Sequence, residues 1–162
     1  MSLIAADIMT RKVVSARPND TAAKVAKLLS DNQISAVPVC DERGGLLGML
    51  SEGDLMRSFS QKNALKRDWW LALLAEGTDL APAFLEHIRF DNRCARDLMV
   101  SPVISAADDA SLPTLAELLT HHRIKRLPIL HDGKLIGIVS RSDIVRALAY
   151  APGAIVDPVE HV

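Results

Sequence analysis

The chain has 162 residues, 49% of them hydrophobic, and a formal net charge of −1. This length and composition can supply a buried core, and the near-zero charge argues against a general nucleic-acid binder, which is usually basic. The apolar runs are too short to cross a bilayer, and the first residues lack a signal-peptide pattern. We therefore expect a cytoplasmic protein with no nucleic-acid or membrane partner. Cys40 and Cys94 have no metal-ligand spacing, so we expect reduced thiols.

The elements of one half of the chain recur in the other half. In chain order, we expect an extended stretch at residues 12–14, a helix capped by Asp20 or Thr21, strands at 36–40 and 46–50 joined by a hairpin turn, and a helix that starts near Asp54. The corresponding elements are expected at residues 102–104, after Asp109 to Ser111, at 126–130 and 135–139, and near Asp143. The order is therefore β-α-β-β-α, twice.

This internal repeat relates residues 7–57 to residues 97–146. Two such units usually pack on each other to bury their apolar faces. The predicted fold class is α+β, with two tandem repeats related by pseudo-twofold symmetry and a helical insert between them. We assign residues 1–58 to repeat 1, 59–93 to the insert, 94–150 to repeat 2 and 151–162 to a loosely ordered tail.

The insert predicts an apolar helical stripe. Its members are Leu65, Trp69, Leu73 and Leu74, and a second short helix is expected at residues 81–89. The stripe is either a lid over the module's own core or a face that binds a partner. Trp69 and Trp70 point about 100° apart on a helix, so both cannot face one core, and this keeps the partner hypothesis open.

Each repeat ends in the pattern Ser-x-x-Asp, as Ser51 with Asp54 and as Ser140 with Asp143. A structural interpretation is a helix capping box, in which the serine and the aspartate satisfy backbone N–H groups. A functional interpretation adds a ligand, because an aspartate beside free helix N–H groups can accept hydrogen bonds from the two hydroxyls of a ribose.

The repeated unit resembles the CBS domain, and its two copies resemble a CBS domain pair, or Bateman module. The resemblance rests on residues 7–10 and 97–99, on the Pro-containing strands at 34–39 and 124–129, and on the two Ser-x-x-Asp motifs. It covers about two-thirds of the chain. It implies two pseudo-symmetric clefts between the repeats that bind an adenosine nucleotide, S-adenosylmethionine or a dinucleotide.

Carried over by position, the resemblance implies one complete cleft. Asp143 would hold the ribose with Ser140 and Ser142 nearby, and Lys125 and Arg126 would meet phosphate. The remaining members of this predicted site, which would flank the base, are Val13, Ile34, Ser35 and Ile138. For the two cations the alternative is a solvated charged surface.

The second cleft is expected to be weaker. It contains Ser51, Asp54 and Ile124, but Ser35 and Ala36 stand where the other copy has Lys125 and Arg126. Burying a phosphate without cations is costly. We therefore expect either one nucleotide site, or a second site suited to a ligand with little negative charge, such as adenosine or S-adenosylmethionine.

No catalytic set and no Gly-rich phosphate loop emerge from the sequence, and we interpret His121 and His122 as surface residues with no metal site. We therefore expect no enzyme and no required cofactor. The favoured function is a regulatory sensor, homodimeric as CBS pairs commonly are, that binds AMP, ADP, ATP or S-adenosylmethionine, with or without Mg²⁺. Occupancy would bias the angle between the repeats and so act on a separate, unknown protein. Two alternatives remain: a structural or dimerisation module with empty clefts, and an accessory subunit of an enzyme such as an IMP-dehydrogenase-like protein.

Overall fold

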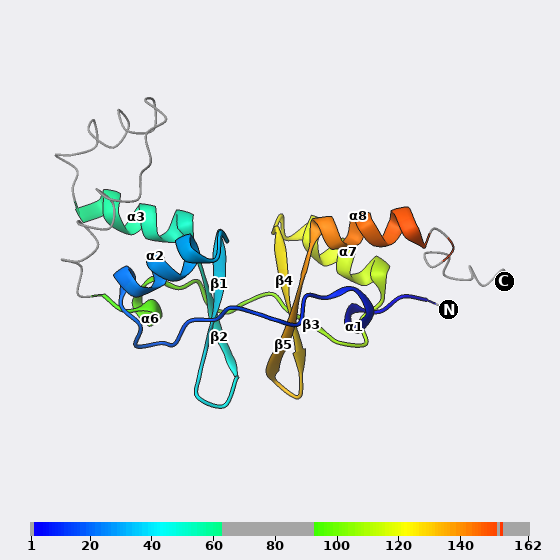
Figure 1. The fold of residues 1–162 in the computed structure, drawn as a ribbon, viewed down its shortest axis with the longest axis horizontal. Helices are drawn as coiled ribbons and strands as arrows, with labels where there is room; N and C mark the ends of the chain where they lie inside the picture. The colour runs from blue at the N-terminus through cyan, green and yellow to red at the C-terminus, as the bar shows by residue number, and fades with distance from the viewer. Residues whose placement is uncertain (1, 63–92, 152, 154–162) are drawn as a thin grey trace, which may run out of the picture. The chain divides into compact units, whose positions relative to one another are not determined.

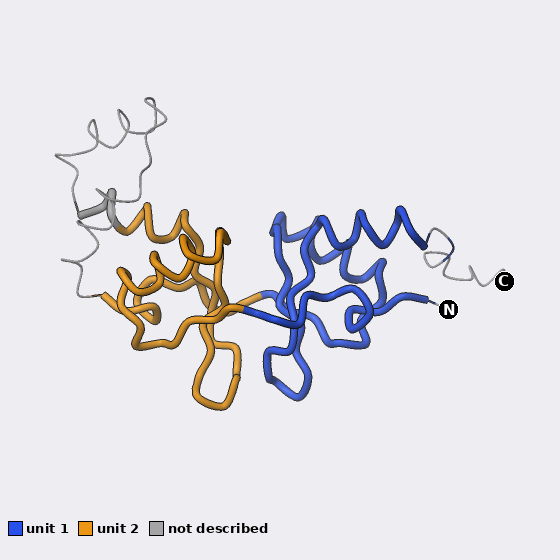
Figure 2. The backbone as a smooth tube through the Cα atoms, viewed as in Figure 1, with its two compact units in different colours: residues 1–13, 104–162 blue, residues 14–103 orange. Residues whose placement is uncertain are grey.

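The computed structural model describes residues 2–62, 93–151 and 153, and shows a mixture of helices and short strands, as the α+β prediction required (Figure 1). The chain divides into two compact units (Figure 2). Unit 1 combines residues 1–13 with residues 104–162, and unit 2 comprises residues 14–103. Each unit therefore contains one repeat together with the segment that leads into the other repeat.

The two units contain equivalent elements, but the short leading helix comes last in unit 2 and first in unit 1 along the chain. In unit 2 these are α2 (Ala22–Asp31), β1 (Ala36–Cys40), β2 (Leu46–Ser51), α3 (Glu52–Lys62) and α6 (Ala95–Leu98). In unit 1 they are α1 (Ala5–Ile8), β3 (Ala106–Ala107), α7 (Leu112–His121), β4 (Arg126–His131), β5 (Lys134–Ser140) and α8 (Arg141–Tyr150). In each unit the two strands of the predicted hairpin pair antiparallel.

The predicted first strand is wrong in its position. Residues 12–14 and 102–104 form no strand; pairing begins instead at Ala16, which bridges Val39 in parallel, and at β3, which pairs in parallel with β4. Parallel pairing with a later strand depends on tertiary contacts. The local β-branched residues therefore predicted the strand at the wrong position in the sequence.

The starts of the long helices follow the predicted capping chemistry. Thr21 Oγ1 accepts the N–H of Lys24 at 3.2 Å, and Ser111 Oγ accepts the N–H of Thr114 at 3.4 Å. Each hydroxyl satisfies one of the N–H groups that a helix leaves free at its first turn. The helices α2 and α7 therefore begin where the sequence predicts.

Both helices end at a residue with left-handed backbone geometry. Gln33 has φ 52° and Arg123 has φ 53°. The next N–H then turns back to the helix, as Ile34 N–H donates to Leu29 O at 3.0 Å in unit 2 and Ile124 N–H donates to Leu119 O at 3.1 Å in unit 1. This turn directs the chain from each helix into the first strand of the hairpin.

Each unit has its own aliphatic core. In unit 2, Val25 and Leu29 of α2 pack with Val37, Val39 and Leu50 of the hairpin. In unit 1 the core contains Leu112, Leu115, Leu119, Leu127, Ile129, Val139 and Ile144. The alternating burial along the strands leaves their other side chains at the surface, where a binding site can form.

The leading segments complete these cores by an identical set of contacts. In unit 1, Thr10 and Ile138 exchange backbone hydrogen bonds of 2.9 and 3.0 Å, and Met9 lies against Gly137. In unit 2, Val100 and Met49 exchange hydrogen bonds of 2.8 and 3.0 Å, and Met99 lies against Gly48. Residues 1–13 thus belong to the fold of the second repeat, and the segment before residue 104 belongs to the fold of the first.

The predicted helices of the insert, including Trp69 and Trp70, lie at residues 63–92, outside the described residues. Most of the tail also lies outside them. Cys40 is buried in β1 and Cys94 precedes α6, and both thiols are free. In the parts of the chain that the structure describes, no helix has the length and apolar character needed to cross a membrane.

Candidate functional site

The Ser-x-x-Asp motif of unit 1 forms a closed capping box at the start of α8. Asp143 Oδ2 accepts the Ser140 N–H at 2.7 Å and the Ser140 hydroxyl at 2.8 Å, while Ser140 Oγ accepts the Asp143 N–H at 3.3 Å. The side chain of Asp143 is only 10% exposed. The structural interpretation of the motif is therefore confirmed, and it fixes the carboxylate beside the helix N-terminus.

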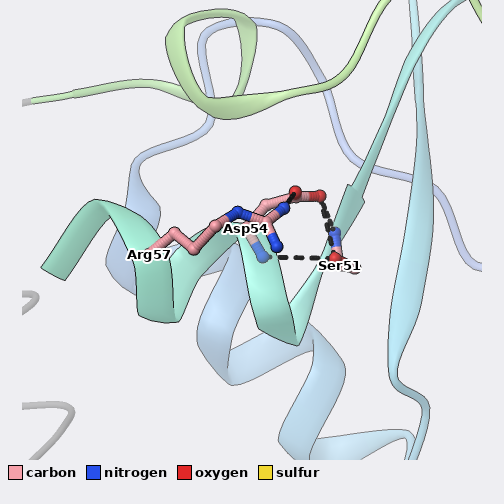
Figure 3. A network of polar contacts seen from close by, with 3 residues as sticks. All are labelled: Ser51, Asp54 and Arg57. Atoms are coloured by element: carbon pink, nitrogen blue, oxygen red, sulfur yellow. Dashed lines mark hydrogen bonds and ion pairs between the residues drawn. The ribbon is translucent and has the colours of Figure 1, made fainter. Parts of the chain in front are cut away.

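Unit 2 repeats this network at the start of α3 (Figure 3). Asp54 Oδ2 accepts the Ser51 N–H and the Ser51 hydroxyl, both at 2.8 Å, and Ser51 Oγ accepts the Asp54 N–H at 3.2 Å. The Asp54 side chain is 9% exposed. Two equivalent carboxylates are thus held in nearly the same geometry, one in each unit.

Arg57 and Arg146 contact the other oxygen of these carboxylates. Arg146 Nη1 lies 3.4 Å from Asp143 Oδ1, and Arg57 Nη2 pairs with Asp54 Oδ1. Both arginine side chains are 67% exposed. The sequence aligned these two arginines as part of the repeat, but only the structure shows that they contact the aspartates.

The strand register places two basic residues next to the capping box of unit 1 along the backbone. Arg126 lies opposite Ser140 in the β4–β5 ladder, and Arg141 N–H donates to Lys125 O at 3.4 Å. Lys125 is exposed and Arg126 is half-buried. The structure therefore brings together both predicted phosphate-binding residues with the predicted ribose-binding pair on one edge of unit 1.

Unit 2 has no cation at the corresponding places. Ala36 lies opposite Ser51 in the β1–β2 ladder, and Glu52 N–H donates to Ser35 O at 2.9 Å. Glu52, at the start of α3, is exposed and occupies the position of Arg141 in unit 1. The carboxylate of unit 2 therefore has less positive charge near it than that of unit 1.

The remaining predicted residues divide between the units. Unit 1 contains four of them, namely Val13, Ile124, Ile138 and Ser142. Ile138 is half-buried beside Thr10, and Ser142 is exposed on α8. Ile34 and Ser35 belong to unit 2. Ile34 and Ser35 were predicted for the site of Asp143, and Ile124 for the site of Asp54. In each case the residue lies in the other unit from the aspartate, so these roles stay predictions.

Thr10 is a candidate that the sequence analysis did not include. It is exposed, it bridges Ile138, and its equivalent in unit 2 is the exposed Val100. The hydroxyl of Thr10 is therefore replaced by an apolar side chain in the other unit. The sequence could have indicated this difference, because Thr10 follows Met9 in the first copy of the repeat and Val100 follows Met99 in the second.

A shallow cavity of about 330 Å³ lies between α1 and α8 of unit 1. Its lining includes both Asp143 and Arg146. The other lining residues are Leu3, Asp7, Ile8, Ala147, Tyr150 and Ala151. The carboxylate with the nearby cations thus borders a surface recess, although the other predicted site residues do not line it.

The arrangement suits binding better than catalysis. A capped carboxylate accepts hydroxyl hydrogen bonds, and neighbouring lysine and arginine side chains attract phosphate. In the described residues, no group of three His, Cys, Asp or Glu side chains is placed to hold a metal ion. What the arrangement offers is recognition of a hydroxylated, anionic small molecule.

The comparison with protein families gives the class. The family model described as CBS domain matches residues 5–61 and 95–150, and the chain belongs to this family. CBS domains are generally non-catalytic regulatory modules. Its two matched regions make it a CBS domain pair protein.

Individual relatives agree with this assignment. The chain is 35% identical over 150 residues to the uncharacterized protein MJ1426 of Methanocaldococcus jannaschii, covering 88% of this chain and 89% of that one. The CBS domain of a CBS domain containing membrane protein from Sphaerobacter thermophilus is 29% identical with a TM-score of 0.66, over 90% and 87% of the two chains. CBSX2 crystallised in complex with AMP is 26% identical with a TM-score of 0.67, over 91% and 97%.

Proposed function

We propose that this protein is a non-catalytic sensor that binds an adenosine nucleotide at the Ser140–Asp143 site and transmits its occupancy to a separate protein. The observation that carries the proposal is the arrangement in unit 1, where backbone pairing brings Lys125 and Arg126 next to the capping box that holds Asp143. A ribose needs hydroxyl acceptors and a phosphate needs cations, and this edge of the unit offers both.

The comparison with CBSX2 supports an adenosine ligand, because that CBS pair protein was crystallised with AMP. S-adenosylmethionine remains the second ligand class of the proposal, since its adenosyl group carries the same ribose. A ligand can change the protein's conformational equilibrium only through different affinities for the two conformations. The sensor therefore needs two conformations that differ at the bound ligand.

The second part of the proposal concerns unit 2. Asp54 is held as Asp143 is, but Ser35 and Ala36 replace the two cations. Because a phosphate buried without cations is costly, we assign to unit 2 a weaker site for an uncharged or cationic adenosyl ligand. The pair of sites would then respond to different members of one ligand class.

Isothermal titration tests the proposal directly. AMP, ADP, ATP, NAD and S-adenosylmethionine are titrated into the purified protein, with and without Mg²⁺, and into Asp143→Ala and Asp54→Ala. We expect saturable nucleotide binding that Asp143→Ala abolishes and that Asp54→Ala retains. Each variant should lose about 0.5–2 kcal/mol of folding free energy with its cap, which thermal unfolding measures separately.

A second titration isolates the phosphate role of Arg126. Arg126→Ala should weaken ATP and ADP more than adenosine, because only the phosphorylated ligands lose a charge-assisted hydrogen bond. Equal weakening of all three ligands would remove the phosphate role. No binding of any ligand to the wild-type chain would favour a structural module with empty clefts.

We also propose that the protein is a cytoplasmic homodimer. Three apolar residues of α8 are exposed, Val145 at 63%, Leu148 at 40% and Tyr150 at 85%, and exposed apolar groups of this kind often mark an interface. Sedimentation equilibrium should give a dimer for the wild-type chain and a monomer for Val145→Asp with Leu148→Asp. A monomeric wild-type chain would contradict this part of the proposal and leave ligand binding unaffected.

A further inference from the structure

The carboxylates of Asp54 and Asp143 have almost all of their hydrogen-bonding capacity in use. A carboxylate has two oxygens and about four acceptor positions. Within the described residues, Oδ2 of Asp143 accepts two hydrogen bonds from Ser140, and Oδ1 accepts one from Arg146. About one acceptor position is left, and it is on Oδ1.

A ribose brings two hydroxyl donors, its 2′-OH and 3′-OH. One of them fits the remaining position of Oδ1, and the second needs a position that is already in use. The backbone N–H of Ser140 cannot leave, because it is held at 2.7 Å by the capping box that starts α8. Either the arginine or the serine hydroxyl must therefore give way.

The arginine is the partner that gives way at lower cost. Arg146 is 67% exposed, and its Nη1 lies 3.4 Å from Oδ1, near the limit of a hydrogen bond. The Ser140 hydroxyl lies at 2.8 Å from Oδ2 inside the capping box. Exposed ion pairs contribute little, because water solvates both groups once they separate.

We propose that Arg146 is a displaceable competitor for the diol-binding carboxylate. This inference rests on the proposed function and adds a residue that determines specificity. In the structure Arg146 contacts Oδ1 of Asp143, and Figure 3 shows the equivalent contact of Arg57 with Asp54. A ligand with a vicinal diol displaces the guanidinium, whereas a ligand with a single hydroxyl binds beside it.

The competition explains why the carboxylate is nearly closed. The Asp143 side chain is 10% exposed although it borders the cavity between α1 and α8, and Arg146 lines the same cavity. Movement of one exposed side chain opens this carboxylate, and no backbone element has to change. Arg146 thus lowers affinity for nucleosides that carry a vicinal diol, without being part of the capping box.

The test compares adenosine with 2′-deoxyadenosine, two neutral nucleosides that differ by one hydroxyl. Both are titrated into Asp54→Ala, which leaves unit 1 as the site measured, and into the same chain carrying Arg146→Met, which keeps the apolar stem and removes the donor. Adenosine affinity should rise by roughly two- to fivefold, the size of an exposed ion pair, and 2′-deoxyadenosine affinity should change by a smaller factor.

The matched control is Lys27→Met, which removes an exposed cation paired with Asp31 on α2, outside both capping boxes. It should change neither affinity. Arg146→Ala serves as a second variant, and thermal unfolding shows that each variant is folded. Equal factors for the two nucleosides, or weaker adenosine binding in Arg146→Met, would overturn the competitor role.

This outcome is distinct from failure of the proposed function. If the wild-type chain binds AMP and the ratio between the two nucleosides does not move, the inference alone is wrong. If the wild-type chain binds adenosine and none of AMP, ADP, ATP and S-adenosylmethionine, or binds no adenosyl ligand at all, the proposed function is wrong and the competitor role is overturned with it. A ratio that moves only in Ser140→Ala would show that the serine hydroxyl gives way instead.

Discussion

The edge of unit 1 that holds Asp143 and the edge of unit 2 that holds Asp54 share a scaffold and differ in charge. Both carboxylates cap a helix through the preceding serine, and both pair with an arginine one turn later. The strand residue opposite the serine is Arg126 in unit 1 and Ala36 in unit 2. The serine and aspartate that start the helix are thus the same in both units, whereas the residues that would determine the preferred charge of a ligand differ.

This difference in charge shows that two roles, stabilising the helix start and setting a ligand preference, belong to different residues of the same short segment. The serine and aspartate stabilise the helix start whether or not a ligand binds, so their presence in both units follows from folding alone. Lys125 and Thr10 are exposed and Arg126 is half-buried, and none of the three belongs to either hydrophobic core. Substitutions at these positions can alter a ligand preference at little cost in stability.

The largest expected effect is a loss of unfolding free energy when the close contact between methionine and glycine is disturbed in either unit, and it tests whether the two units are packed equivalently. A Cβ at Gly137 would meet Met9, and one at Gly48 would meet Met99, with the methionine Cβ 3.1 and 3.0 Å away. Gly137→Ala and Gly48→Ala should each cost about 1–3 kcal/mol of unfolding free energy through overcrowding. Urea denaturation of each variant measures the cost. Gly53→Ala, where a Cβ would make only ordinary contacts of 3.6 Å, separates overcrowding from a general glycine effect.

The next effect sharpens the difference in charge. Ser35→Lys with Ala36→Arg gives unit 2 the cations of unit 1. In an Asp143→Ala background, these substitutions should strengthen ATP binding by about tenfold, the size of one charge-assisted hydrogen bond. Calorimetry reads the gain, and adenosine serves as the control because it has no phosphate. A gain for adenosine of the same size would contradict the charge argument.

A smaller effect should be equal in the two units. Gln33 and Arg123 hold left-handed backbone angles at the ends of α2 and α7, which glycine adopts without strain. Gln33→Gly and Arg123→Gly should each stabilise the protein by about 0.5 kcal/mol, after the greater entropy of glycine in the unfolded chain is subtracted. Thermal unfolding tests this, and destabilisation in one unit alone would show that the two helix ends are not equivalent.

The smallest effect belongs to unit 1 alone. A hydrogen bond with Asp108 at 3.0 Å, together with the charges of Asp108, Asp132 and Asp109, raises the pKa of His131 above its usual 6.5. The contribution to stability is therefore complete below the unfolded pKa and is lost as the pH rises through the folded value. NMR titration of His131 in Asp108→Asn should return the pKa toward 6.5, and an unchanged titration would contradict the role of Asp108.

Much of the fold was accessible from the sequence because its signals are local. Thr21 and Ser111 start helices through their own side chains, and the glycine turns between paired apolar runs mark the hairpins. The Ser-x-x-Asp boxes are equally local, so spacing alone found the candidate carboxylates, whereas the flanking cations were assigned by position from the resemblance to the CBS domain.

The missed features depend on contacts distant in sequence. Ala106 and Ala107 carry no strand pattern, and they form β3 because β4 lies beside them. Met9 contacts Gly137 across most of the chain, although both residues recur in the repeat. Arg146 was visible as a repeated residue, but its contact with Asp143 requires the helical geometry in which side chains three residues apart are neighbours.

The exchange of leading segments defines which fragments of this protein can be complete. A fragment cut at the repeat, residues 94–150, carries its own Met99 but lacks the Met9 that covers Gly137. Since the two segments make identical backbone contacts, each is a potential substitute for the other. A complete unit 1 therefore requires residues 1–13 as well as the residues from 104 onward, although the whole of unit 2 separates the two segments in sequence.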